Sequence, residues 1–221
     1  MTLLSPLEAR VLGVLVEKQH TVPDTYPLSL NSLVAGCNQK TARAPVMEAS
    51  EADVLVAVDS LKHQHLVFQG SGSRVARYEH NMGRVLGVPS QSVALLATLL
   101  LRGPQTAAEL RLNTERLHRF ADISSVDAFL DELASKPPPR VVKLPRMPGE
   151  REARWAHLLS GEPVLPVMAA GGYAAAADSG VAPSELAALK AEMLRLATEL
   201  GELKTEVQAL KAELGMAPNA G

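Results

Sequence analysis

A pattern of five residues (alanine, arginine, an aromatic residue, any residue, histidine) occurs twice in this chain of 221 residues. Residues 76–80 read Ala-Arg-Tyr-Glu-His, and residues 153–157 read Ala-Arg-Trp-Ala-His. Each copy closes a stretch in which three helix-forming segments are followed by strand-like runs. A match that recurs with its surroundings indicates an internal duplication. The chain is therefore expected to contain two copies of one small unit.

Residues 1–82 form the first predicted domain. Its first helix begins at a capping box, Ser-Pro-Leu-Glu, at residues 5–8. A short helix ending at Gly36 and a third helix capped by Ser50 follow. Two strand-like runs lie within residues 66–78, joined by glycines and serines. Three helices followed by a hairpin is the order of a winged helix, a helix-turn-helix with a β wing.

Residues 83–160 form the second predicted domain and repeat this order. An apolar helix covers residues 92–101, a capping box at Thr106 opens the second helix, and the serines at 124–125 cap the third. A strand at 141–144 and a returning strand make the second wing. Hydrophobic residues are 47% of the chain but aromatic residues only 3%, which favours helical cores of Leu, Val and Ala. The predicted fold class is mainly α with small β wings, as two tandem winged-helix domains plus a C-terminal coiled coil.

The C-terminal part of the chain is predicted to be a flexible linker, residues 161–183, and a coiled-coil helix, residues 184–215. The linker is rich in Gly, Pro and Ala. The helix carries four heptads, about 45 Å at 1.5 Å per residue, with glutamate at every g position and lysine at most e positions. These charges favour a parallel homodimer. A trimer, and a helix folded back onto its own domain, are the alternatives. The seam consists of Leu186, Leu189, Met193, Leu196, Leu200, Leu203, Val207, Leu210 and Leu214.

Charge is unevenly distributed along the chain, although its net value is only −2. Residues 83–160 hold 11 Lys/Arg against 8 Asp/Glu, whereas residues 161–221 hold 4 against 8. A polyanion would therefore meet the middle segment first. The third helix of a helix-turn-helix usually enters the major groove. Here the predicted third helices, 51–61 and 126–133, carry Asp and Glu and no Arg, Asn or Gln in their first two turns. Ordinary groove insertion is not expected.

Basic residues gather instead in the loop before each third helix and in the second wing. The functional interpretation is contact with DNA phosphates, which would position the protein with little sequence selectivity. The alternative is a solvated basic face with no ligand. The candidate phosphate contacts are Lys40, Arg43, Arg116, Arg119, Lys143, Arg146, Arg151 and Arg154.

No motif for catalysis, a metal or a cofactor is found in the sequence. It has no phosphate-binding Gly-rich loop and no His-Glu-x-x-His helix, and the only close histidine pair, at 63 and 65, lacks a cysteine or carboxylate cluster. Cys37 is interpreted as a buried small hydrophobe, and His80 and His157 as structural residues at strand ends. We expect no enzyme activity, no membrane span and, given a single cysteine and no signal peptide, a cytoplasmic protein.

Several strings of residues resemble the YceH-like family of uncharacterised bacterial proteins. The resemblance covers residues 4–161 and implies a tandem winged-helix fold, without implying an activity, ligand or catalytic residue. Two positions depart from the family pattern, which leads us to expect a polar residue such as Asn at Ala42 and Tyr at Trp155. The strings are residues 5–13, 17–18, 25–31, 37–41 and 146–154.

Two functions remain open at this point. The first is a non-enzymatic, dimeric, DNA-associated protein, such as a transcription regulator, that contacts phosphates through the second domain. The second is a scaffold that binds a basic protein surface through its acidic third helices, as tandem winged helices do in some chromosome-organising complexes. Fold alone does not decide between them.

Overall fold

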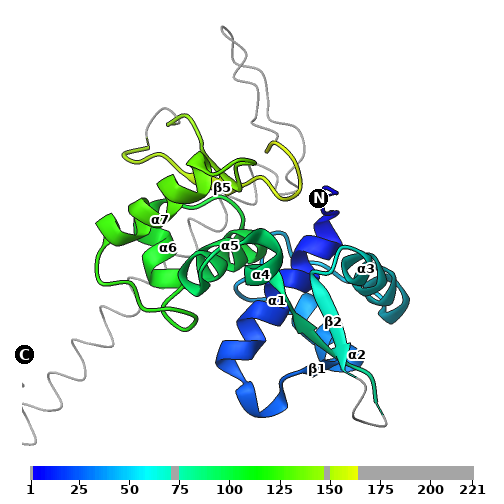
Figure 1. The fold of residues 1–221 in the computed structure, drawn as a ribbon. Helices are drawn as coiled ribbons and strands as arrows, with labels where there is room; N and C mark the ends of the chain where they lie inside the picture. The colour runs from blue at the N-terminus through cyan, green and yellow to red at the C-terminus, as the bar shows by residue number, and fades with distance from the viewer. Residues whose placement is uncertain (1, 71–74, 147–149, 164–221) are drawn as a thin grey trace, which may run out of the picture. The chain divides into compact units, whose positions relative to one another are not determined.

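The computed structural model describes residues 2–70, 75–146 and 150–163, so the predicted coiled-coil seam and nearly all of the predicted linker lie outside the described residues (Figure 1). The described part is mainly helical, with two small antiparallel sheets. Its helices are α1 (Pro6–Thr21), η1 (Pro23–Thr25, a 3₁₀ turn), α2 (Leu30–Cys37), α3 (Glu51–His63), α4 (Met82–Leu86), α5 (Ser90–Arg102), α6 (Ala107–Asn113) and α7 (Ile123–Ser135). Its strands are β1 (Leu28–Ser29), β2 (Val67–Gly70), β3 (Arg77–His80), β4 (Val141–Lys143) and β5 (Trp155–His157).

Helix α1 lies at the centre of the described structure. The predicted capping box forms, because the Glu8 carboxylate accepts from the Ser5 amide at 2.6 Å and the Ser5 hydroxyl accepts from the Glu8 amide at 3.2 Å. Every residue from Glu8 to Val16 is buried, which requires partners on all sides of the helix. Helices α2, α3 and α5 supply them. At the crossing with α5 a Cβ added to Gly13 would lie 2.9 Å from Leu101 Cγ, so glycine permits the close approach.

The first half of the described structure carries a three-stranded sheet in the order β1-β3-β2. Tyr78 in the middle strand pairs with Gln69 on one side and with Leu28 on the other. Strand β1 directly precedes α2, whose N-cap is Ser29. The two-residue strand β1 and the five-residue helix α4 were not predicted, since neither is long enough to show a periodicity.

The second half follows the same order of elements. Strands β4 and β5 pair, and Trp155 in β5 also forms an isolated bridge with Gln105, directly before the Thr106 cap of α6. The predicted capping box at Thr106 is confirmed. The predicted cap of α7 by serines 124–125 is wrong. Asp122 caps the helix, because its carboxylate accepts from the Ser125 amide at 2.7 Å, and Ser125 is the third residue of that box.

The two halves are joined by packing and by backbone hydrogen bonds. The Ala44 amide donates to the Leu101 carbonyl at 2.8 Å, and the Leu4 amide to the Leu159 carbonyl at 2.8 Å. The described residues accordingly form one compact unit. Its division into two domains at residue 82 stays a prediction. Among the described helices, none has the length and apolar character needed to span a bilayer.

Candidate nucleic-acid interface and polar site

The arginine of the repeated pattern has the same partner in both halves. Arg77 Nη1 donates to the Pro27 carbonyl at 2.8 Å, and Arg154 Nη1 donates to the Pro104 carbonyl at 3.2 Å. Both bonds join residues 50 positions apart. Each ties the returning strand to the turn that precedes the second helix of its half, so the repeated arginine has a structural role.

The aromatic residue and the histidine of the pattern are also structural. Tyr78 and Trp155 are 4% and 2% exposed. His80 and His157 end strands β3 and β5, as expected, and burial lowers the pKa of each imidazole to about 4. Both side chains are therefore neutral at pH 7. The aromatic residue and the histidine of the pattern thus have structural roles in the returning strand of each half.

Arg154, one of the predicted phosphate contacts, is held by carboxylates of the protein itself, and its contact with DNA stays a prediction. Its guanidinium forms ion pairs with Glu150 at 3.0 Å and with Glu109 at 2.9 Å, and these carboxylates raise its pKa. The two carboxylates and the Pro104 carbonyl accept from Nε and Nη1, and the side chain is 35% exposed. Its bond to the Pro104 carbonyl joins the returning strand to the turn before α6, as the bond from Arg77 to Pro27 does in the first half.

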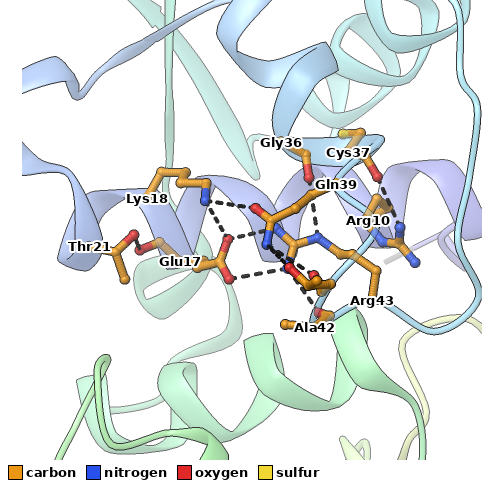
Figure 2. Close-up of polar contacts among 10 residues, drawn as sticks. Arg10, Glu17, Lys18, Thr21, Gly36, Cys37, Gln39, Ala42 and Arg43 are labelled. Atoms are coloured by element: carbon orange, nitrogen blue, oxygen red, sulfur yellow. Dashed lines mark hydrogen bonds and ion pairs between the residues drawn. The ribbon is translucent and has the colours of Figure 1, made fainter.

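Arg43 is also a structural residue, contrary to the prediction. Figure 2 shows it reaching from the loop after α2 to Glu17 on α1. Its side chain is 0% exposed. Nη1 and Nη2 donate to the two Glu17 carboxylate oxygens at 3.1 and 2.6 Å, and Nε donates to the Gly36 carbonyl at 3.2 Å. A second bond from Nη1 reaches the Ala42 carbonyl at 2.9 Å. No donor on this guanidinium faces solvent.

A second buried arginine supports the same loop. Arg10 is 1% exposed and donates to the Cys37 carbonyl at 3.0 Å (Figure 2). It also donates to the Pro45 carbonyl at 2.5 Å. Burial raises the pKa of the Cys37 thiol to about 12, in spite of the nearby Arg10 and Arg43, so the cysteine is an unreactive core residue, as predicted. Arg10 was not singled out from the sequence, although its position within the apolar residues of the first helix was the available signal.

Glu17 and Lys18 form the polar side of this cluster. Burial alone would raise the pKa of the Glu17 carboxyl, but hydrogen bonds and charge from Arg43, aided by Lys18, hold that pKa below its ordinary value. Lys18 Nζ lies 3.0 Å from the Glu17 carboxylate and donates to Gln39 at 3.2 Å. Two strings that carry the family resemblance, residues 17–18 and 37–41, thus meet at one place.

A polar pocket of about 330 Å³ lies beside the cluster, between the two halves. Its cations are Lys18, Arg102 and Arg116, and its single carboxylate is Glu17. The remaining lining residues are Thr21, Gln39, Thr41, Ala42, Thr98, Leu101, Asn113 and Leu117. The structure therefore brings the predicted residue Arg116 next to the loop that contains the predicted residue Lys40.

The other predicted cations are exposed but do not join this group. Arg119 lies beyond α6, and Lys143 lies on β4 with Nζ 5.1 Å from the centre of the Trp155 ring. Arg146 and Arg151 lie on either side of the β4–β5 connection. The side chains of Lys143, Arg146 and Arg151 form no hydrogen bond or ion pair with any described residue. We call these three residues the wing cations.

The third helices, α3 and α7, present the acidic faces that the sequence predicts. Glu51, Asp53 and Asp59 are exposed on α3, and Asp131 and Glu132 on α7. Helix α3 also exposes apolar side chains, Leu55 at 39% and Val56 at 71%, and neighbouring β2 exposes Phe68 at 43%. Within the described ranges, no three His, Cys, Asp or Glu residues are arranged to hold a metal ion.

Comparison with known proteins places these features in a bacterial family. The profile of the family described as "Protein of unknown function, DUF480" matches residues 4–150. A UPF0502 protein of Leptothrix cholodnii is 70% identical over 189 residues, covering 86% of this chain and 85% of the relative. A UPF0502 protein of Cupriavidus pinatubonensis is 67% identical over 217 residues, covering 98% of this chain and 92% of the relative. One of Burkholderia multivorans is 64% identical over 221 residues, with the same coverage of both chains.

Proposed function

The chain belongs to the DUF480 family, and we propose that it is a non-catalytic tandem winged-helix protein that attaches to DNA phosphates through the wing of its second half. The observation that carries this proposal is the set of wing cations. They are exposed and lack a carboxylate partner within the described residues, whereas Arg43 is buried against Glu17 and Arg154 is paired with Glu109 and Glu150.

The tandem winged-helix assignment is supported by equivalent interactions in the two halves. Tyr78 pairs with Leu28 before the Ser29 cap, and Trp155 bridges Gln105 before the Thr106 cap. The repeated arginine bonds the preceding proline carbonyl in each case. In both halves a third helix and a strand pair follow. These are the parts of a winged helix in order.

Contact through the wing is consistent with the acidic faces of α3 and α7 and with the basic charge of the wing itself. The acidic faces of α3 and α7 would be repelled by phosphates, so neither helix is expected to enter the major groove. Lys143, Arg146 and Arg151 can each reach a phosphate oxygen without reading a base. Such binding depends steeply on salt and only weakly on sequence.

A gel-shift titration with mixed-sequence duplex DNA at low salt tests the proposal. The double variant Arg146→Ala with Arg151→Ala is expected to weaken binding on the order of tenfold, because each phosphate contact contributes to the electrostatic free energy. Arg84→Ala, which removes one charge from an exposed arginine on α4, is the control. It should weaken binding much less than either Arg146→Ala or Arg151→Ala alone. Absence of a shift with the wild-type chain, or equal shifts for the wild type and the double variant, would refute the proposal.

A second function, docking of a basic protein segment on α3, is favoured by a separate observation. Val56 and Leu55 are exposed beside Glu51 and Asp59, which combines an apolar contact with charge complementarity for a cationic amphipathic partner. Capture from lysate with Val56→Asp compared with Leu112→Asp, an equally exposed leucine on α6, tests it. A protein partner lost only with Val56→Asp supports docking. Recovery of nucleic acid alone counts against it.

A further inference from the structure

We propose that the pocket between α1, α5 and α6 binds a small phosphorylated molecule. Its walls come from both halves of the described unit: the C-terminal part of α1 and the loop after α2 on one side, and the end of α5 and the end of α6 on the other. A volume of about 330 Å³ is at the lower end of the range for small-molecule sites.

The charge of the pocket selects an anion. Glu17 is its only carboxylate among the lining residues, and Arg43 and Lys18 already neutralise that carboxylate. Two further cations, Arg102 and Arg116, line the pocket, and neither guanidinium has a hydrogen bond or ion pair with another described residue. Two unengaged guanidinium groups on residues that line one concave site can offer paired donors that match the geometry of a phosphate group.

The uncharged lining favours a polar body attached to that phosphate. Thr41, Gln39 and Asn113 line the pocket, and their hydroxyl and amide groups suit the hydroxyls of a ligand. Leu101 and Leu117 supply a small apolar surface. A sugar phosphate has this combination of a dianionic head, several hydroxyls and a compact carbon skeleton.

A free small molecule fits this site better than a DNA backbone does. A duplex presents its phosphates on a convex surface, whereas these cations lie in a hollow between helices. The wing cations do not line the pocket. The inference therefore does not depend on the DNA-binding proposal, and either can fail without the other.

Thermal unfolding of the full chain with glucose 6-phosphate tests the inference, with sodium chloride at matched ionic strength as the salt control. The wild-type chain should show a saturable rise in Tm that sodium chloride does not reproduce. In the double variant Arg102→Gln with Arg116→Gln, the apparent Kd should rise on the order of tenfold or more, because two charge-assisted hydrogen bonds are lost. The matched control, Arg84→Gln with Arg119→Gln, removes two exposed arginines outside the pocket and should retain binding.

With the sugar phosphate, three results would each overturn the inference. They are the absence of a saturable rise in Tm for the wild-type chain, an equal loss of binding in the control variant, and an unchanged affinity in the pocket variant. Circular dichroism melts without ligand separate lost binding from lost folding, and Arg102→Lys with Arg116→Lys should restore part of the affinity. A short DNA duplex serves as a separate arm. If the pocket variant loses duplex binding as strongly as sugar-phosphate binding, the pocket cations belong to a DNA interface and the inference is wrong.

Discussion

At the scale of single residues, the environment of an arginine decides whether its charge is available to a ligand. Arg43 and Lys40 lie three positions apart in one loop, yet Arg43 is buried against Glu17 and Lys40 is exposed. Glu17, the partner of Arg43, is 26 positions away in the sequence, on helix α1. The composition of the loop could indicate that it is basic. It could not indicate which side chain turns inward.

The buried pair gives a direct prediction for stability. Arg43→Ala should lower the free energy of unfolding by about 2–3 kcal/mol, because it leaves the part-buried Glu17 carboxylate without its main partner. Lys40→Ala, in the same loop, should change it by less than about 0.5 kcal/mol. Urea denaturation followed by circular dichroism measures both. Similar values for the two variants would show that Arg43 does not have the structural role described above.

The backbone at Ala42 explains the polar residue that the family resemblance led us to expect there. Ala42 has a φ of 57°, in the left-handed region that costs an ordinary residue about 1 kcal/mol or more and that asparagine adopts more readily. Ala42→Asn should therefore stabilise the fold by about 0.5–1 kcal/mol in urea denaturation. Ala52→Asn, at an exposed site in α3, should destabilise it slightly through lower helix propensity. A loss of stability with Ala42→Asn would contradict this account.

At the scale of elements, most features set by neighbouring residues could be predicted from the sequence, whereas those set by distant contacts could not. The capping boxes at Ser5 and Thr106 and the cap at Ser50 follow from short sequence patterns, and the structure has all three. The cap of α7 was placed wrongly because Asp122 and the serines after it are all good cap residues. Strand β1 exists through its pairing with β3, a contact that two residues of sequence cannot reveal.

The repeated strand ends predict a dependence of stability on pH. Burial lowers the pKa of His80 and His157 from an ordinary value of 6.5 to about 4, so between these values the unfolded chain binds protons that the folded chain excludes. Stability is therefore complete above about pH 6.5 and falls as the pH decreases towards 4. Between about pH 7 and 5 the loss should be about 1–2 kcal/mol for each histidine.

Urea denaturation at pH 7 and pH 5 measures this loss. The variant His157→Gln should reduce the difference in unfolding free energy between the two pH values, since glutamine does not titrate. Glu17, whose pKa is lowered, contributes only at more acidic pH and does not obscure the window. An unchanged difference in the variant would show that His157 does not titrate as described.

At the scale of the whole molecule, the heptad repeat beyond the described residues predicts a dimer. Its leucine seam and its glutamate and lysine flanks favour a parallel pair. Sedimentation equilibrium at micromolar concentration should give twice the chain mass for the full protein and the mass of one chain for a protein ending at residue 163. A full-length monomer would contradict the predicted coiled coil.

The association of the wing with DNA is the central claim, and the salt dependence of binding tests it most directly. Fluorescence anisotropy with a mixed-sequence duplex, between about 50 and 200 mM salt, gives the slope of log Kd against log salt. The triple variant Lys143→Ala, Arg146→Ala and Arg151→Ala removes three phosphate contacts from each wing that binds DNA. The slope of log Kd against log salt should therefore be smaller in this variant than in the wild-type chain, by about 3 for each wing bound. The same slope in the triple variant and the wild-type chain, or no binding at the lowest salt, would contradict it.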